Sequence, residues 1–174
     1  EMVLAVERIA SAPGEGGAAL VGTVGTIDAR PGAINVIPQH VSFTVDVRSA
    51  DDVARRRATA VMRDAFDAIA TRRRVKVASE VFYELPAAPC DASLQDALAA
   101  SVARQGLPVR RLPSGAGHDA MVFPPVCPIA MLFVRCGAGG ISHHPDETMT
   151  AEDAEVATSV FVDFLETWTP PECR

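Results

Sequence analysis

Residues 35–48 read NVIPQHVSFTVDVR, and apolar and polar side chains alternate along most of this stretch. The apolar set is Val36, Val41, Phe43, Val45 and Val47, and the polar set is Ser42, Thr44, Asp46 and Arg48. Successive side chains of a strand point to opposite faces, so this pattern predicts a strand with one buried face. Pro38 has no N–H to donate and is expected to interrupt the strand near its start.

The segments on either side of this strand predict an antiparallel sheet with helices on one face. Apolar periodicity predicts helices over residues 1–10 and 51–73, and β-rich composition predicts strands over 18–27 and 75–85. A Pro-Gly turn at 28–32 separates the first two strands. The order helix, strand, strand, helix, strand is typical of an α+β layer.

The pattern changes after residues 86–89, whose two prolines indicate a linker or crossover. Helices are predicted over 94–105 and from Thr150, which opens a capping box, to about residue 168. Short strands are predicted over 109–112 and 129–134. This second half is typical of an α/β arrangement, so the predicted fold class is mixed α/β.

Charge and hydropathy exclude two classes of partner. The chain has 174 residues, a net charge of −6 and a pI near 5.2. Its basic runs are Arg72–Arg74 and Arg55–Arg57, and the second of these is expected to be a solvated helix face. A negative chain does not favour the phosphate backbone, so no nucleic-acid partner is expected. No apolar run approaches the roughly 20 residues that cross a bilayer, so no membrane partner is expected.

The cysteines at 90, 127, 136 and 173 form no C-x-x-C pair and lack zinc-ribbon spacing. Cys127 and Cys136 lie beside apolar residues and are expected to be buried as small hydrophobes. Reduced thiols indicate a cytoplasmic protein.

Three of the four histidines lie in two glycine-containing polar clusters, residues 114–120 (SGAGHDA) and 139–147 (GGISHHPDE). His143 is a candidate metal ligand that a neighbouring polar side chain can orient. The alternative is a polar loop with no metal. A zinc centre needs three or four ligands, so the chain contains at most part of a metal site.

Two further features are candidate substrate contacts. The backbone N–H groups of 115–118 can form an anion nest, or this segment is a glycine turn capped by Asp119. Arg48 can hold a carboxylate through two parallel hydrogen bonds. The alternative for Arg48 is a salt bridge with an aspartate at position 46, 51 or 52.

Four segments together resemble the hydantoinase/carbamoylase branch of the M20 metallopeptidase-like amidohydrolases, which includes N-carbamoyl-L-amino acid hydrolase, β-ureidopropionase and allantoate amidohydrolase. They are GAINVIP at 32–38, FTVDVR at 43–48, SGAGHDA at 114–120 and GISH at 140–143. Each motif alone is weak, but the four occur in the family's order. The resemblance extends over roughly residues 1–168.

The resemblance implies a two-domain enzyme in which a catalytic α/β domain binds two divalent metal ions, zinc, manganese, cobalt or nickel. An inserted α+β lid, an antiparallel sheet with helices on one face, mediates formation of a homodimer. Residues 1–86 match this lid without its N-terminal part, and residues 87–174 match the C-terminal part of the catalytic α/β metallohydrolase domain.

The resemblance also implies roles for particular residues. His143 matches the last metal ligand, Asn35 and Arg48 match lid residues that hold the carboxylate of a small-molecule substrate, and Gly115, Ala116, Gly117 and His118 match the pocket loop. The family's general base and other ligands match no segment of this chain, so no catalytic residue is expected within it and the chain alone is expected to be inactive.

The expected parent activity is hydrolysis of a linear amide, an N-carbamoyl or ureido group, on a small carboxylic acid. Two alternatives remain at this point. One is an M20-type exopeptidase or deacylase, against which the SGAGHDA form of the third motif argues. The other is a non-catalytic fragment that only dimerises.

Overall fold

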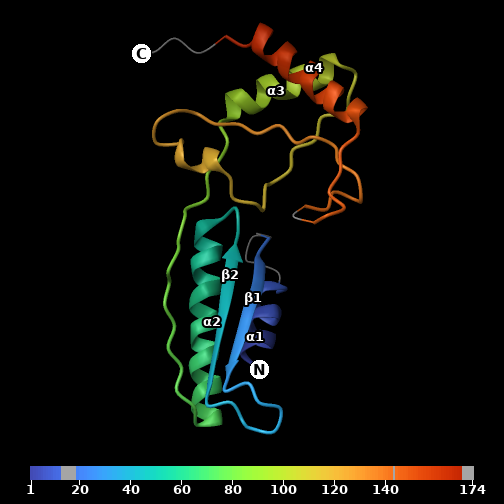
Figure 1. Cartoon of the computed structure of the whole chain (residues 1–174). Helices are drawn as coiled ribbons and strands as arrows, with labels where there is room; N and C mark the ends of the chain where they lie inside the picture. Colours follow the sequence, from blue (N-terminus) through green and yellow to red (C-terminus); the bar gives the residue numbers. More distant parts are fainter. Residues whose placement is uncertain (13–18, 143, 170–174) are drawn as a thin grey trace. The chain divides into compact units, whose positions relative to one another are not determined.

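The computed structural model describes residues 1–12, 19–142 and 144–169, which form two compact units (Figure 1). The first unit comprises Glu1–Ala88 with Pro113–Gly117, and the second comprises Pro89–Leu112 with His118–Arg174. The assignment of 1–86 to a lid and 87–174 to a catalytic domain remains a prediction. Within the described ranges, no helix has the length and apolarity needed to span a membrane.

The first unit is organised around an antiparallel pair of strands, β1 (Val21–Arg30) and β2 (His40–Arg48). Their register places Val21 opposite Arg48 at one end and Arg30 opposite His40 at the other. The predicted strand over 35–48 is therefore correct only from His40. Residues 35–39 belong to the connection, which closes where the Gln39 N–H donates to the Arg30 carbonyl at 2.9 Å.

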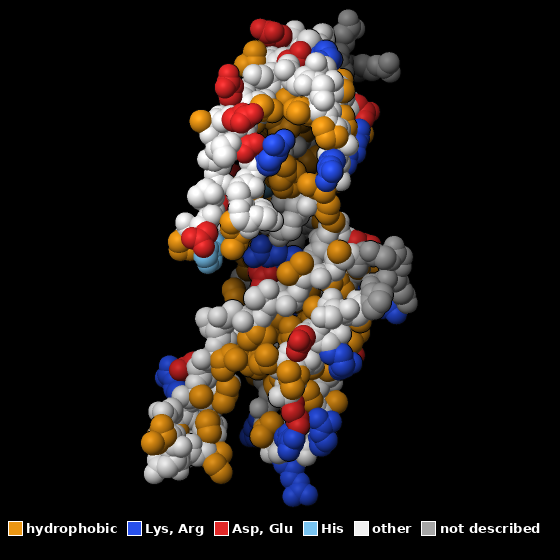
Figure 2. Space-filling model, turned by 90° about the vertical axis from the view of Figure 1, so that its right-hand side faces the viewer, with side chains coloured by type: hydrophobic (Ala, Val, Ile, Leu, Met, Phe, Trp, Pro, Cys, Tyr) orange, Lys and Arg blue, Asp and Glu red, His pale blue; other side chains and the backbone are white. Residues whose placement is uncertain are grey.

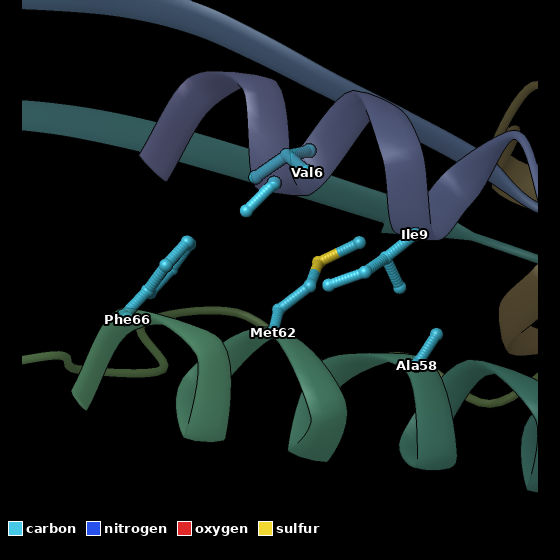
Figure 3. Packing of buried hydrophobic residues seen from close by; sticks show 6 residues of the cluster. Val6, Ile9, Ala58, Met62 and Phe66 are labelled. Atoms are coloured by element: carbon cyan, nitrogen blue, oxygen red, sulfur yellow. The ribbon is translucent and has the colours of Figure 1, made fainter. Parts of the chain in front are cut away.

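Two helices, α1 (Met2–Ala10) and α2 (Asp52–Arg73), supply most of the core of this unit (Figure 3). The buried side chains are Ala5, Val6, Ile9, Ala58, Met62 and Phe66. Phe43, Val45 and Val47 of β2 pack against this cluster, whereas Thr44, Asp46 and Arg48 are exposed. From Phe43 to Arg48 the alternation seen in the sequence thus becomes an apolar inner face and a polar outer face, whereas Val41 near the start of β2 is 50% exposed.

Three predicted strands are not formed. Residues 75–85 run beside α2 without pairing (Figure 1), and 109–112 and 129–134 are also irregular. A strand needs neighbouring backbone groups to complete its ladder. In the part of the chain that the structure describes, the one sheet is β1–β2, so these segments have no ladder partner.

The second unit contains α3 (Ala92–Arg104), the short 3-10 helix η2 (Asp119–Val122) and α4 (Ala151–Thr167). The predicted cap of α4 is confirmed, because the Thr150 hydroxyl accepts a hydrogen bond from the Asp153 N–H at 3.0 Å. The buried side chains of α3 and α4 are Leu98, Ser101, Val160 and Phe164.

The expected burial of Cys127 is wrong, and Cys136 is only half-buried. Cys127 lies in a turn in which its N–H donates to the Phe123 carbonyl at 2.9 Å. A turn projects its side chains toward solvent, so the apolar neighbours of Cys127 in the sequence do not enclose it.

We expect Met62→Ala to lower the free energy of unfolding of the first unit by about 3 kcal/mol, because it leaves a cavity beneath a side chain that is only 2% exposed. Urea denaturation measures this loss. Val61→Ala on the same helix is the matched control, since Val61 is 44% exposed and should cost less than about 1 kcal/mol. Equal losses for the two variants would contradict the core described above.

Candidate functional site

Arg48 is the centre of the candidate site. It ends β2 on the polar face, where its Nε donates to Asp46 Oδ1 at 2.7 Å and its Nη2 donates to Asp46 Oδ2 at 3.2 Å. Its Nη1 donates to the Gly115 carbonyl oxygen at 3.2 Å. Two motifs that are 67 positions apart in the sequence therefore meet within the first unit.

The Arg48–Asp46 ion pair lies at the surface, with the two side chains 50% and 51% exposed. The hydrogen bond to Asp46 raises the pKa of the Arg48 guanidinium above its ordinary value, so this side chain stays charged. Of the three candidate aspartates, Asp46 is thus the one that forms a salt bridge with Arg48. Asp51 instead caps α2, and Asp52 bonds to Arg55 at 3.1 Å.

The salt bridge does not exhaust Arg48 as a hydrogen-bond donor. A guanidinium has five N–H donors, of which Asp46 takes two and Gly115 takes one. In the contacts of the described residues, one donor remains on each of Nη1 and Nη2. A carboxylate can accept from both of these atoms, so the two sequence interpretations of Arg48 are compatible in one structure.

The loop at 113–117 presents the Gly115 carbonyl to Arg48 and contains a local hydrogen bond. The Ser114 hydroxyl donates to the Ala116 carbonyl at 3.1 Å, and Gly115, Ala116 and Gly117 are exposed. This arrangement places an acceptor, the Gly115 carbonyl, against Arg48. It fixes one edge of the site to the end of β2.

His118 lies in the second unit, where it caps η2. Its Nδ1 accepts a hydrogen bond from the Ala120 N–H at 3.1 Å, and its carbonyl accepts from the Met121 N–H at 3.0 Å. The cap of this turn is therefore His118 and not Asp119. With Nδ1 serving as an acceptor, a neutral His118 carries its proton on Nε2, which can donate to a ligand.

Asn35 is exposed in the connection between β1 and β2. The hairpin register puts this connection at the end of the sheet opposite to Arg48. The length of β2, nine residues that include Arg48, separates them, and at the usual strand rise this corresponds to roughly 27 Å. The structure therefore does not bring Asn35 and Arg48 of one chain to the same small ligand.

The predicted metal ligand, His143, lies outside the described residues. Its neighbour His144 accepts a hydrogen bond from the Asp146 N–H through Nδ1 at 3.2 Å. Across the described ranges, no group of three or more His, Cys, Asp or Glu side chains is arranged to hold a metal ion. The described residues alone thus do not build a metal centre.

Sequence reasoning named Asp46 only as one of three possible partners of Arg48. Two residues separated by two positions on a strand share a face, and this spacing is the signal that distinguishes Asp46 from Asp51 and Asp52. No sequence feature pointed to the contact between Arg48 and the Gly115 carbonyl.

The family model of peptidase family M20/M25/M40 matches residues 6–167, and the chain belongs to this family. The resemblance inferred from the four motifs is confirmed, as is the mixed α/β fold class. An amidase of the hydantoinase/carbamoylase family from Burkholderia multivorans superposes with a TM-score of 0.81 at 35% identity, covering 94% of this chain and 39% of that structure.

Two relatives indicate the branch of the family. An N-carbamoyl-L-amino acid amidohydrolase from Geobacillus stearothermophilus is 37% identical over 140 residues, which cover 80% of this chain and 34% of the relative. A probable allantoate deiminase from Oryza sativa subsp. japonica is 39% identical over 160 residues, covering 86% and 32%. The chain thus spans about a third of the length of these relatives.

We expect His118→Ala to accelerate hydrogen exchange at the Ala120 amide roughly five-fold, since losing such a cap costs about 1 kcal/mol. His118→Asn should preserve protection, because its Oδ1 occupies the place of Nδ1. The Met121 amide is an internal control, as it bonds to the His118 carbonyl in every variant. Unchanged exchange at Ala120 in His118→Ala would show that the imidazole does not cap this turn.

Proposed function

We propose that this chain is part of a metal-dependent amidohydrolase that cleaves a linear amide, an N-carbamoyl or ureido group, on a small carboxylic acid. The observation that carries the proposal is the Arg48 guanidinium, held against Gly115 with two donors left for a carboxylate. The names of the relatives, an N-carbamoyl-L-amino acid amidohydrolase and an allantoate deiminase, support this substrate class.

The alternatives receive less support. An exopeptidase or deacylase belongs to the same broad family, but the relatives above are named for carbamoyl and allantoate substrates. A fragment that only dimerises gives no reason for an arginine to face a glycine loop from a distant segment.

Amidohydrolases of this family generally depend on divalent metal ions. We propose two such ions, zinc, manganese, cobalt or nickel, with His143 as one ligand. The described residues do not by themselves assemble a metal site. Apart from His143, the residues of this chain are proposed to act in substrate binding.

Arg48 recognises the substrate carboxylate, and this fixes the position of the amide several bonds away. A planar guanidinium matches a carboxylate in geometry as well as in charge, so it restrains both the distance and the plane of the substrate. Correct placement of the scissile group is itself a source of rate enhancement. Gly115, Ala116, Gly117 and His118 are proposed to bind the substrate too, because they match the family's pocket loop in sequence.

We expect Arg48→Ala, in an active enzyme that contains this chain, to lower kcat/KM for an N-carbamoyl amino acid. The corresponding rise in activation free energy is about 2–5 kcal/mol, because the substrate carboxylate loses its partner. Arg48→Lys should not rescue, since an ammonium lacks the two-pronged fork. The control substrate is the corresponding neutral amide, on which Arg48→Ala should have little further effect. An equal loss on both substrates would make Arg48 a structural residue.

Asn35 is proposed to contact the substrate of a second copy of the chain. The two candidate substrate contacts lie roughly 27 Å apart along β2, which exceeds the size of a small carboxylic acid. A homodimer formed through the first unit can supply Asn35 from one copy and Arg48 from the other. The site is then complete only in the dimer.

Surface features support this arrangement. Asn35 is flanked by Ile34 and Val36, and Ile34 and Ile37 are among the most exposed large apolar residues described, so hydrophobic side chains gather on the projecting end of the hairpin (Figure 2). Exposed apolar patches are typical of protein contacts. Among the residues that the structure describes, each strand of the two-stranded sheet also has an edge without a ladder partner, to which another copy can add.

Mixing two inactive variants tests the composite site. If one copy supplies Asn35 and the other supplies Arg48, co-expressed Asn35→Ala and Arg48→Ala subunits should recover about a quarter of the sites, since about half the dimers are mixed and each has one intact site. Activity per subunit measures the recovery. Absence of recovery in dimers shown by mass spectrometry to be mixed would contradict it, as would a monomeric active enzyme.

A further inference from the structure

We infer that Asp46 is a positioning residue, which holds the Arg48 guanidinium in the plane and orientation that receive the substrate carboxylate. This inference rests on the proposed function, because it assigns Asp46 a role in the carboxylate recognition proposed for Arg48. Asp46 itself does not contact the substrate in this arrangement; it acts through Arg48.

Two contacts from different directions restrain the guanidinium. Asp46 accepts from Nε and Nη2 along one edge, and the Gly115 carbonyl accepts from Nη1. An arginine side chain has several rotatable bonds, so a single contact leaves the plane of its guanidinium undetermined. Three hydrogen bonds to two anchors restrain that plane before any ligand arrives.

Asp46 also determines which donors of Arg48 are available. Because its carboxylate occupies the Nε–Nη2 edge, an incoming carboxylate can accept only from the remaining donors on Nη1 and Nη2. The approach of the substrate is thereby limited to the end of the guanidinium. Asp46 thus determines the direction from which the substrate carboxylate approaches, whereas Arg48 supplies the positive charge that binds it.

The pair is suited to positioning rather than to stability. Both side chains are half exposed, and ion pairs of this kind contribute little to the free energy of folding. Asp46→Asn, which keeps the size of the side chain, is therefore expected to leave the fold intact. The chain also offers a matched control, Asp28→Asn, because Asp28 and Arg30 form an ion pair of the same spacing on β1 at 2.8 Å.

The first experiment follows the arginine Nε–H signals by NMR in the 174-residue chain. The Arg48 signal is identified by its absence in Arg48→Lys. Asp46→Asn should speed exchange of the Arg48 Nε–H with water roughly ten-fold, the effect of losing a hydrogen bond to a charged group. Asp28→Asn should change the Arg30 signal and leave that of Arg48 unaltered. No change at Arg48 in Asp46→Asn would overturn the inference.

The second experiment measures kinetics in an active enzyme that contains this chain. Asp46→Asn should raise KM for an N-carbamoyl amino acid roughly ten-fold and leave the neutral amide substrate almost unaffected, because binding of the carboxylate is what weakens. Asp46→Glu, which retains a carboxylate, should recover part of the loss. In an Arg48→Ala background, Asp46→Asn should have no further effect.

The outcomes separate this inference from the proposed function. If Arg48→Ala does not distinguish the carboxylate from the amide substrate, the proposed carboxylate contact fails. If Arg48→Ala distinguishes them but Asp46→Asn leaves KM unchanged, or acts equally in the Arg48→Ala background, then Asp46 does not position Arg48 and the inference is wrong.

Discussion

The period-two alternation of side chains along β2 is the constraint on which the core and the candidate site both depend. Phe43, Val45 and Val47 pack toward α1 and α2, so Asp46 and Arg48 must point to the opposite face. A shift of the strand by one residue would exchange the two sets. The energy of burying apolar side chains therefore also fixes the direction of a functional arginine that contributes almost nothing to the core.

This dependence explains how a surface residue can be held in place. Exposed arginines usually sample many conformations, and their ion pairs are weak. Arg48 instead begins from a rigid strand end, meets Asp46 on the same strand, and reaches the Gly115 carbonyl of a distant segment. Each contact is weak, but together they define one orientation, because the strand that presents Arg48 and Asp46 is set by packing in the first unit.

The sequence was sufficient for features that depend on near neighbours. The helices, the cap at Thr150 and the packing of Phe43, Val45 and Val47 against the core follow from local periodicity and side-chain chemistry. The segments at 75–85 and 129–134 have the composition of strands, but pairing depends on a neighbouring backbone that composition cannot identify. The contact between Arg48 and Gly115 could not be predicted from local sequence either, because it joins segments 67 positions apart.

The positions of Asn35 and Arg48 show how register can change a functional interpretation. In the sequence the two residues bracket one strand and both match substrate contacts of the family, which suggests one site in one chain. An antiparallel hairpin of this length instead separates its connection from its open end by the whole length of β2. Lengthening or shortening the hairpin would move Asn35 relative to Arg48 without altering either residue. If the two residues share a substrate across a dimer, the length of β2 is then itself a determinant of substrate recognition.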